Sequence, residues 1–209
     1  MLAAKLDQYK QTNTAIIALS PGAVIVGAQI AMRLHATLMM LLTENITMPG
    51  ENMPLAAITS DNTFTYNNKF STGEIEEMRS EFINFIESER LTKLHHLHSL
   101  LGHGGEIHRE LLRNHVVILV SDGLNNGLSL DVAADYLKPV KTKRLIAVTP
   151  LASVTAIDKM HLMADEEVCL STVQNYMETN HYYDDNTIPS NENLLKVIMT
   201  MPVHWSQSS

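Results

Sequence analysis

The sequence predicts an α/β domain in which a mostly parallel, twisted sheet carries helices on both faces. Short apolar runs rich in β-branched residues, typical of strands buried on both faces, alternate with segments whose apolar residues recur at helical spacing. The strongest run, Val116–Val120, is followed directly by Ser-Asp-Gly, a strand-to-helix turn signal. The 209 residues, 45% of them hydrophobic, are enough for one core. A single domain over residues 1–209 is therefore expected, with a peripheral tail at about 187–209.

The first half of the chain is expected to begin with a short amphipathic helix and a buried strand. A helix that is apolar on nearly every side should follow, and such a helix belongs in the core. Asp61-Asn62 predicts a hairpin turn between two further strands. The expected elements are a helix over 2–9, a strand over 15–19, a helix over 24–42, a loop over 44–54, strands over 55–59 and 64–66, and a long helix over 73–98.

The second half continues the alternation of strand and helix. Ser129 is a plausible helix N-cap, and Pro139 should stop the helix that it begins. The expected elements are strands over 116–120, 145–149 and 168–170 and helices over 130–137, 153–164 and 193–201.

Composition excludes several classes of protein. The formal net charge of −8 provides no basic surface for nucleic acid. Residues 11–32 carry no charge and are numerous enough to span a bilayer, but Ser20, Pro21 and Gly22 in their middle predict a strand-to-helix turn, so no membrane segment is expected. The single cysteine, Cys169, lies in an apolar run that predicts a buried strand, and the chain fits a reducing cytoplasm.

The loop Ser121–Ser129 is the main candidate for a ligand site. Backbone N–H groups at a helix N-terminus have no intrahelical partner and, with the helix dipole, favour an anion. Gly123 and Gly127 would let the backbone approach a phosphate closely, and Asp122 would project at the carboxyl end of the strand. The alternative is a plain connection in which glycine and asparagine serve only the turn.

These residues resemble the signature of the type I phosphoribosyltransferases. That signature is a buried strand, two acidic residues, a glycine, two variable residues and Thr-Gly-variable-Thr opening a helix, and 116–129 matches it in length and in most positions. Residues 18–24 resemble the family's first strand-turn-helix. Ala56-Ala57-Ile58 with Asp61, and the stretches 167–170 and 182–185, resemble later parts, so the resemblance covers nearly the whole chain. The chain most resembles the small bacterial phosphoribosyltransferase domain proteins.

The resemblance implies a Rossmann-like fold and a pentosyltransferase activity. The enzyme would transfer 5-phosphoribose from phosphoribosyl diphosphate (PRPP) to a nitrogenous acceptor, with Mg²⁺ bound through the diphosphate. The expected ligand is PRPP or a nucleotide monophosphate, and a homodimer is one option for the assembly. Ser121 and Asp122 would hold ribose hydroxyls. The 5′-phosphate would bind Gly123, Leu124, Asn125, Asn126, Gly127, Leu128 and Ser129, and the pyrophosphate would face Ser20, Pro21, Gly22 and Ala23.

The chain departs from the family at several of these positions. Ser121 replaces an acidic residue and Asn126 a threonine, while Pro21 replaces a basic residue and removes a backbone N–H. Ala23 replaces a glycine, and Asp131 in the first helical turn would compete with a phosphate for the helix dipole. A catalytically inactive nucleotide- or phosphate-binding or regulatory module is therefore the alternative function. A dinucleotide-binding oxidoreductase is disfavoured because the first glycine turn lacks G-x-G-x-x-G spacing.

Five histidines cluster around a glycine-rich loop before the central strand. Their spacing is compatible with a metal site, but without nearby cysteines or a zinc-helix motif they are expected to be titratable surface groups, with no metal bound. The loop itself is expected to act as a lid. The residues are His95, His96, His98, His103 and His108, and the loop is Gly102–Glu106.

Overall fold

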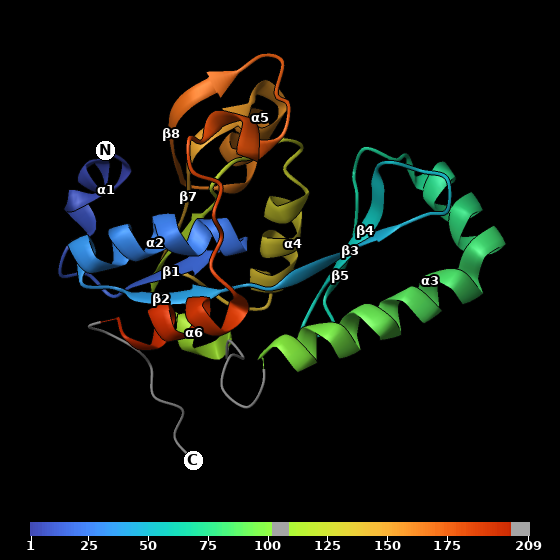
Figure 1. Ribbon diagram of the computed structural model, residues 1–209, viewed down its shortest axis with the longest axis horizontal. Helices are drawn as coiled ribbons and strands as arrows, with labels where there is room; N and C mark the ends of the chain where they lie inside the picture. The colour runs from blue at the N-terminus through green and yellow to red at the C-terminus, as the bar shows by residue number, and fades with distance from the viewer. Residues whose placement is uncertain (102–108, 202–209) are drawn as a thin grey trace.

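The computed structural model describes residues 1–101 and 109–201 and has a five-stranded parallel sheet at its centre (Figure 1). One row of paired residues, Met40, Ala18, Val120, Val148 and Val168, runs across all five strands. The predicted fold class, α/β with a mostly parallel sheet, is confirmed. In spatial order the strands are β2 (Thr37–Met40), β1 (Thr14–Ala18), β6 (Val116–Val120), β7 (Arg144–Ser153) and β8 (Glu166–Val173).

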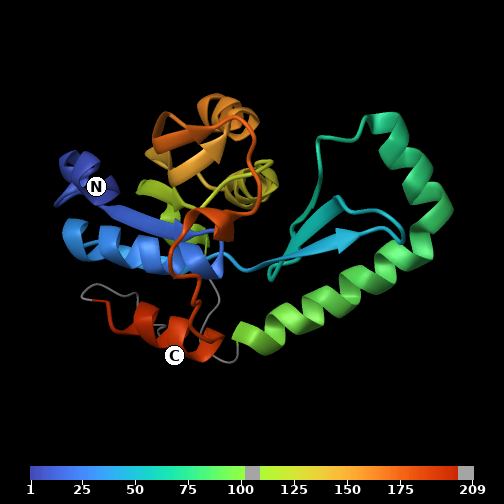
Figure 2. The ribbon, with the colours of Figure 1, turned by 45° about the horizontal axis from the view of Figure 1, so that its top comes forward.

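Two apolar cores lie on the two faces of this sheet, because successive side chains of a strand point to opposite sides. In β1, Ile16 and Ala18 contribute to one core and Ala15 and Ile17 to the other. Helices cover both faces, as predicted (Figure 2). The first core is covered by α1 (Leu2–Lys5), α2 (Pro21–Leu34) and α6 (Asn191–Met199), and the second by α4 (Leu128–Leu137) and α5 (Val154–Met163).

A second, antiparallel sheet stands beside the first together with the long helix α3 (Figure 1). The predicted hairpin is confirmed: Ala57 of one strand pairs with Thr65 of the next. Ala57 also packs on Leu128 and Val132 of α4, and Thr65 Oγ1 donates to Asp135 Oδ2 at 2.9 Å. The second sheet is thus fixed to α4. Its elements are β3 (Thr43–Thr47), β4 (Pro54–Thr59), β5 (Phe64–Tyr66) and α3 (Thr72–Leu101).

The helix expected over 24–42 and the loop expected over 44–54 are partly wrong. The helix ends at Leu34, because His35 adopts a left-handed conformation with φ 54°. Thr37–Met40 then forms the edge strand β2 beside β1, and Thr43–Thr47 forms β3. An apolar run that passes from helix to strand without glycine or proline gives no periodic signal of the change.

The N-cap predicted at Ser129 is also wrong. Helix α4 begins at Leu128 after Gly127, whose φ of 71° is in the left-handed region that glycine tolerates, and Ser129 lies inside the first turn. Asn126 Oδ1 accepts the backbone N–H of Leu128 at 3.1 Å. The start of this helix is therefore set by an Asn-Gly turn.

The remaining elements follow the expected order. Leu2, Leu6 and Tyr9 are buried, as the amphipathic pattern predicted, while Cys169 is only half-buried on the edge strand β8. Helix α6 contributes the fully buried Leu194 to the core, so this part of the tail is packed on the domain. Within the described part of the chain, no helix combines the length and apolarity needed to cross a membrane. The described residues also form the short 3-10 helices η1 (Asp7–Tyr9), η2 (Arg109–Leu112) and η3 (Thr179–Tyr182).

Candidate functional site

The two turns singled out from the sequence lie in contact at the carboxyl ends of β1 and β6. Ser20 is the N-cap of α2: its Oγ accepts the N–H of Ala23 at 3.0 Å and donates to Asp122 Oδ1 at 2.6 Å. Pro21 occupies the first helical turn, where a missing N–H costs least. The structure therefore brings Ser20–Ala23 and Asp122 together across 102 residues of chain.

Gly22 is required for this contact. A Cβ at this position would overlap Asp122 Oδ2 and would lie 2.9 Å from Asp122 Cγ. One carboxylate oxygen of Asp122 thus accepts the Ser20 hydroxyl, and the other packs against the glycine. Asp122 is held as a bridge between the two turns.

Ser121 is buried and faces its own loop. Its Oγ donates to the carbonyl of Gly123 at 2.9 Å and accepts the N–H of Gly123 at 3.2 Å. These bonds fix the turn that follows β6. The contact between Ser121 and a ribose hydroxyl stays a prediction. To make it, the Ser121 hydroxyl would have to give up a hydrogen bond to Gly123.

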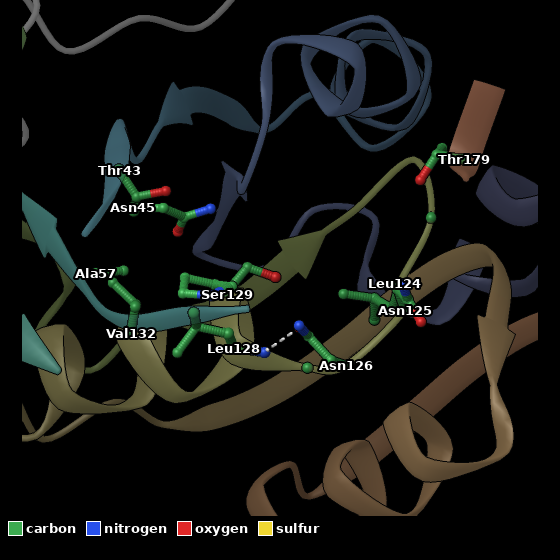
Figure 3. A pocket seen from close by; sticks show the side chains of 13 residues that line it. Thr43, Asn45, Ala57, Leu124, Asn125, Asn126, Leu128, Ser129, Val132 and Thr179 are labelled. Carbon is green, nitrogen blue, oxygen red and sulfur yellow. Dashed lines mark hydrogen bonds between the residues drawn. The ribbon is translucent and has the colours of Figure 1, made fainter. Parts of the chain in front are cut away.

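A pocket of about 230 Å³ opens beside the loop (Figure 3). Every one of the seven residues predicted to hold a phosphate, 123–129, lines it, whereas Ser20–Ala23, Ser121 and Asp122 lie outside the lining. The described residues that line the pocket have no charged side chain, and many of them have a hydroxyl or amide group. The other lining residues are Thr43, Asn45, Pro54, Ala57, Val132 and Thr179.

Strand β7 holds the outer part of the loop in place. The N–H of Leu124 donates to the carbonyl of Leu151 at 3.1 Å, and the N–H of Ser153 donates back to the carbonyl of Leu124 at 2.8 Å. Ser153 Oγ also donates to the carbonyl of Asn125 while capping α5. The loop is therefore pre-organised by backbone pairing, which sequence reasoning did not anticipate because β7 extends beyond the predicted strand.

An ion pair between Asp131 and Lys159 lies at the base of the same loop. Both side chains are mostly buried, and burial raises the pKa of Asp131 while the lysine acts to lower it. The Lys159 stem packs against Gly127, where an added Cβ would lie 2.5 Å from Lys159 Cδ. The sequence predicted that Asp131 would oppose a bound phosphate; the structure supplies a cation that sequence reasoning missed.

A late segment of the chain covers the outer side of Gly123. Tyr183 Oη donates to the carbonyl of Asp122 at 2.6 Å, and Tyr176 Oη lies 2.9 Å from Thr179 Oγ1. A Cβ on Gly123 would overlap Tyr176 Oη and lie 2.7 Å from Thr179 Cγ2. Of the aromatic-acidic stretch 182–185, Tyr183 reaches the site and the carboxylates of Asp184 and Asp185 are exposed.

Tyr183 should titrate unusually late. Burial, followed by the charge of Asp122, raises its pKa from 10.0 to about 12. Because the unfolded chain loses this proton first, Tyr183 should stabilise the fold below pH 10, and its contribution should disappear as the pH rises towards 12. Burial also raises the pKa of Tyr9 and Tyr176, so several tyrosines should titrate late in the wild type, and Tyr183→Phe should lose absorbance from the latest part of the tyrosinate titration. If the absorbance lost in Tyr183→Phe instead belonged to the part of the curve near pH 10, the placement of Tyr183 would be contradicted.

Two of the histidines on α3 contact the second sheet or the turn that follows β4. His96 Nδ1 lies 2.8 Å from Glu44 Oε1, and His98 Nε2 lies 2.8 Å from the carbonyl of Ser60. Among the residues that the structure describes, no three His, Cys, Asp or Glu side chains form a group suited to a metal ion. His103, His108 and the lid predicted at Gly102–Glu106 lie outside the described residues.

No protein-family model and no curated protein sequence matches the chain. Among solved structures, TT1426 from Thermus thermophilus is similar, with a TM-score of 0.72 and 21% identity, covering 96% of this chain and 93% of TT1426. A hypoxanthine phosphoribosyltransferase from Staphylococcus aureus has a TM-score of 0.47 and 13% identity, covering 82% and 68% of the two chains. A purine phosphoribosyltransferase from Pyrococcus horikoshii has a TM-score of 0.44 and 14% identity, covering 85% and 82%. The parallel sheet and the similarity to TT1426 show the fold, which is the α/β class that the sequence predicted.

Proposed function

We propose that the chain binds a small phosphorylated ligand of the phosphoribosyl type, with the phosphate held by residues 123–129. The observation that carries this proposal is the convergence of all seven loop residues on one pocket at the carboxyl end of β6. Open α/β sheets bind ligands at this edge. The N-terminus of α4 adds the positive end of a helix dipole to the same pocket.

The side chains around the pocket suit a sugar phosphate. Thr43 and Asn45 approach from β3, and Ser129 approaches from α4 on the facing side (Figure 3). Hydroxyl and amide groups both donate and accept, so they can bind sugar hydroxyls as well as phosphate oxygens. Ala57, Leu128 and Val132 form an apolar base on which the carbon skeleton can rest.

The size of the pocket limits the ligand. Its volume of about 230 Å³ is below the roughly 300–1,000 Å³ typical of sites for drug-sized ligands. A phosphorylated pentose is therefore favoured over a complete nucleotide, whose base would extend beyond the pocket. Ribose 5-phosphate is the simplest ligand of this class.

Phosphoribosyl transfer is the second candidate function, favoured by the contact between Ser20 and Asp122 that joins the two predicted turns. The residues present do not fit a Mg²⁺ site of the protein itself, because Asp122 already accepts the Ser20 hydroxyl and packs against Gly22. We propose Mg²⁺ only as an ion bound to the diphosphate of PRPP. The proposed binding of a sugar phosphate in the pocket does not require it. Binding without transfer is the better supported function.

Ser129→Asp should weaken the binding of ribose 5-phosphate at least about tenfold, since it places a carboxylate where the phosphate should bind. Ser129→Asn introduces a side chain of nearly the same shape as aspartate but without its charge. The dissociation constant of this variant for ribose 5-phosphate should stay within about threefold of the wild-type value. Isothermal titration calorimetry measures both effects. No binding by the wild type at millimolar ribose 5-phosphate would contradict the proposal.

Transfer is tested separately. The wild type is incubated with PRPP, Mg²⁺ and a panel of purine and pyrimidine bases, and released pyrophosphate is measured. Pyrophosphate release that depends on the acceptor base and is lost in Ser129→Asp would establish phosphoribosyl transfer. Binding of ribose 5-phosphate without release is the result expected for a binding protein.

A further inference from the structure

We infer that Lys159 is a positioning residue for the anion-binding loop, which it makes receptive to a phosphate by neutralising Asp131. This inference rests on the proposed function. Lys159 lies on α5 and Asp131 in the first turn of α4, and the two side chains form an ion pair across 28 residues of chain.

Asp131 occupies a position that opposes an anionic ligand. It lies within one helical turn of Leu128, Ser129 and Val132, which line the pocket. A carboxylate in the first turn of a helix interacts with the same positive helix end that would attract a phosphate. An uncompensated negative charge here would therefore repel the ligand at short range.

The burial of this pair strengthens the argument. Only 25% of the Asp131 side chain and 17% of the Lys159 side chain are exposed, so water screens these charges less than it screens surface charges. Asp135, one turn later on α4, adds a second negative charge near Asp131, although Thr65 donates to it. Lys159 therefore offsets a local excess of negative charge at the loop.

Gly127 fixes the path of the lysine. The Lys159 stem crosses this residue, with Cδ, Cβ and Cγ all within 3.5 Å of the place where a Cβ would stand. The same glycine has the positive φ that turns the loop into α4. The residue that shapes the loop thus also provides the space through which the counter-charge reaches Asp131.

Two roles for Lys159 have opposite consequences. If Lys159 acts by balancing the charge of Asp131, removing both charges in a double variant should leave ligand binding close to that of the wild type. A lysine that binds the phosphate directly would still be missed in that double variant. Lys159 is absent from the pocket lining, which favours the neutralising role.

A double-mutant cycle separates these roles, with ribose 5-phosphate as the probe and calorimetry as the measurement. Lys159→Met should weaken binding about tenfold, whereas Asp131→Asn should tighten it severalfold because the lysine charge is then free to attract the anion. The double variant should return to within about threefold of the wild type. Lys159→Arg keeps the charge and should also bind within about threefold.

Urea denaturation of all variants identifies any that fail to fold. If Lys159→Met is unfolded, the comparison of Asp131→Asn with the wild type still decides, because a purely structural ion pair predicts no tightening by Asp131→Asn. A double variant as weak as Lys159→Met, or Asp131→Asn that binds like the wild type, would overturn the inference alone. A wild type that does not bind ribose 5-phosphate would overturn the proposed function and this inference together.

Discussion

Leu194→Ala is expected to lower the free energy of unfolding by about 2–5 kcal/mol, measured by urea denaturation. Leu194 is fully buried in the core that also contains residues of α2 and β1. Truncating the side chain removes apolar contacts and leaves a cavity that the packed helices fill only partly. The loss should be large although the residue lies near the end of the described chain.

Met199→Ala is the matched control on the same helix. Its side chain is 67% exposed, so its replacement should change the free energy of unfolding by less than about 0.5 kcal/mol. A small effect of both variants would mean that α6 is not packed on the domain. A large effect of both would mean that helix formation itself, and not the burial of Leu194, is being measured.

Elements whose surroundings are uniform could be predicted from the sequence. Val116–Val120 is an apolar run in the centre of the sheet, flanked by parallel strands on both sides, and its observed bounds are those predicted. Edge strands were harder. β2 follows α2 after only His35 and Ala36, and the apolar residues around this break are equally compatible with a helix or a strand.

The candidate site was predictable as far as it depends on one stretch of chain. The spacing of glycines in 121–129 predicted a loop between strand and helix, and the seven residues expected to hold a phosphate line one pocket. The partners of the loop come from remote segments. Lys159 reaches Asp131, Ser153 holds Asn125, and Tyr183 holds the carbonyl of Asp122, and each of these pairings depends on how the elements pack. Local sequence patterns do not predict which remote residues such packing brings together.

Gly22→Ala is expected to lower the free energy of unfolding by about 2–4 kcal/mol. The new Cβ would overlap Asp122 Oδ2, and moving the carboxylate would break its 2.6 Å bond with Ser20 Oγ. The better helix propensity of alanine offsets about 1 kcal/mol of this loss. Gly73→Ala is the control, because it lies in the first turn of α3 and its Cβ would meet nothing within 4 Å. The control should be neutral or slightly stabilising.

The cause of the Gly22 effect can be isolated by removing the group that the new methyl strikes. In Gly22→Ala with Asp122→Ala the clash is gone, so the double variant should be more stable than the sum of the single effects predicts, by about 1–3 kcal/mol. Additive effects would show that Gly22 is needed for backbone freedom and not for the approach of Asp122. A positive coupling would show that the two turns are held together through this contact. Gly22→Ala should then also weaken ribose 5-phosphate binding, because Asp122 directly precedes the loop residues that line the pocket.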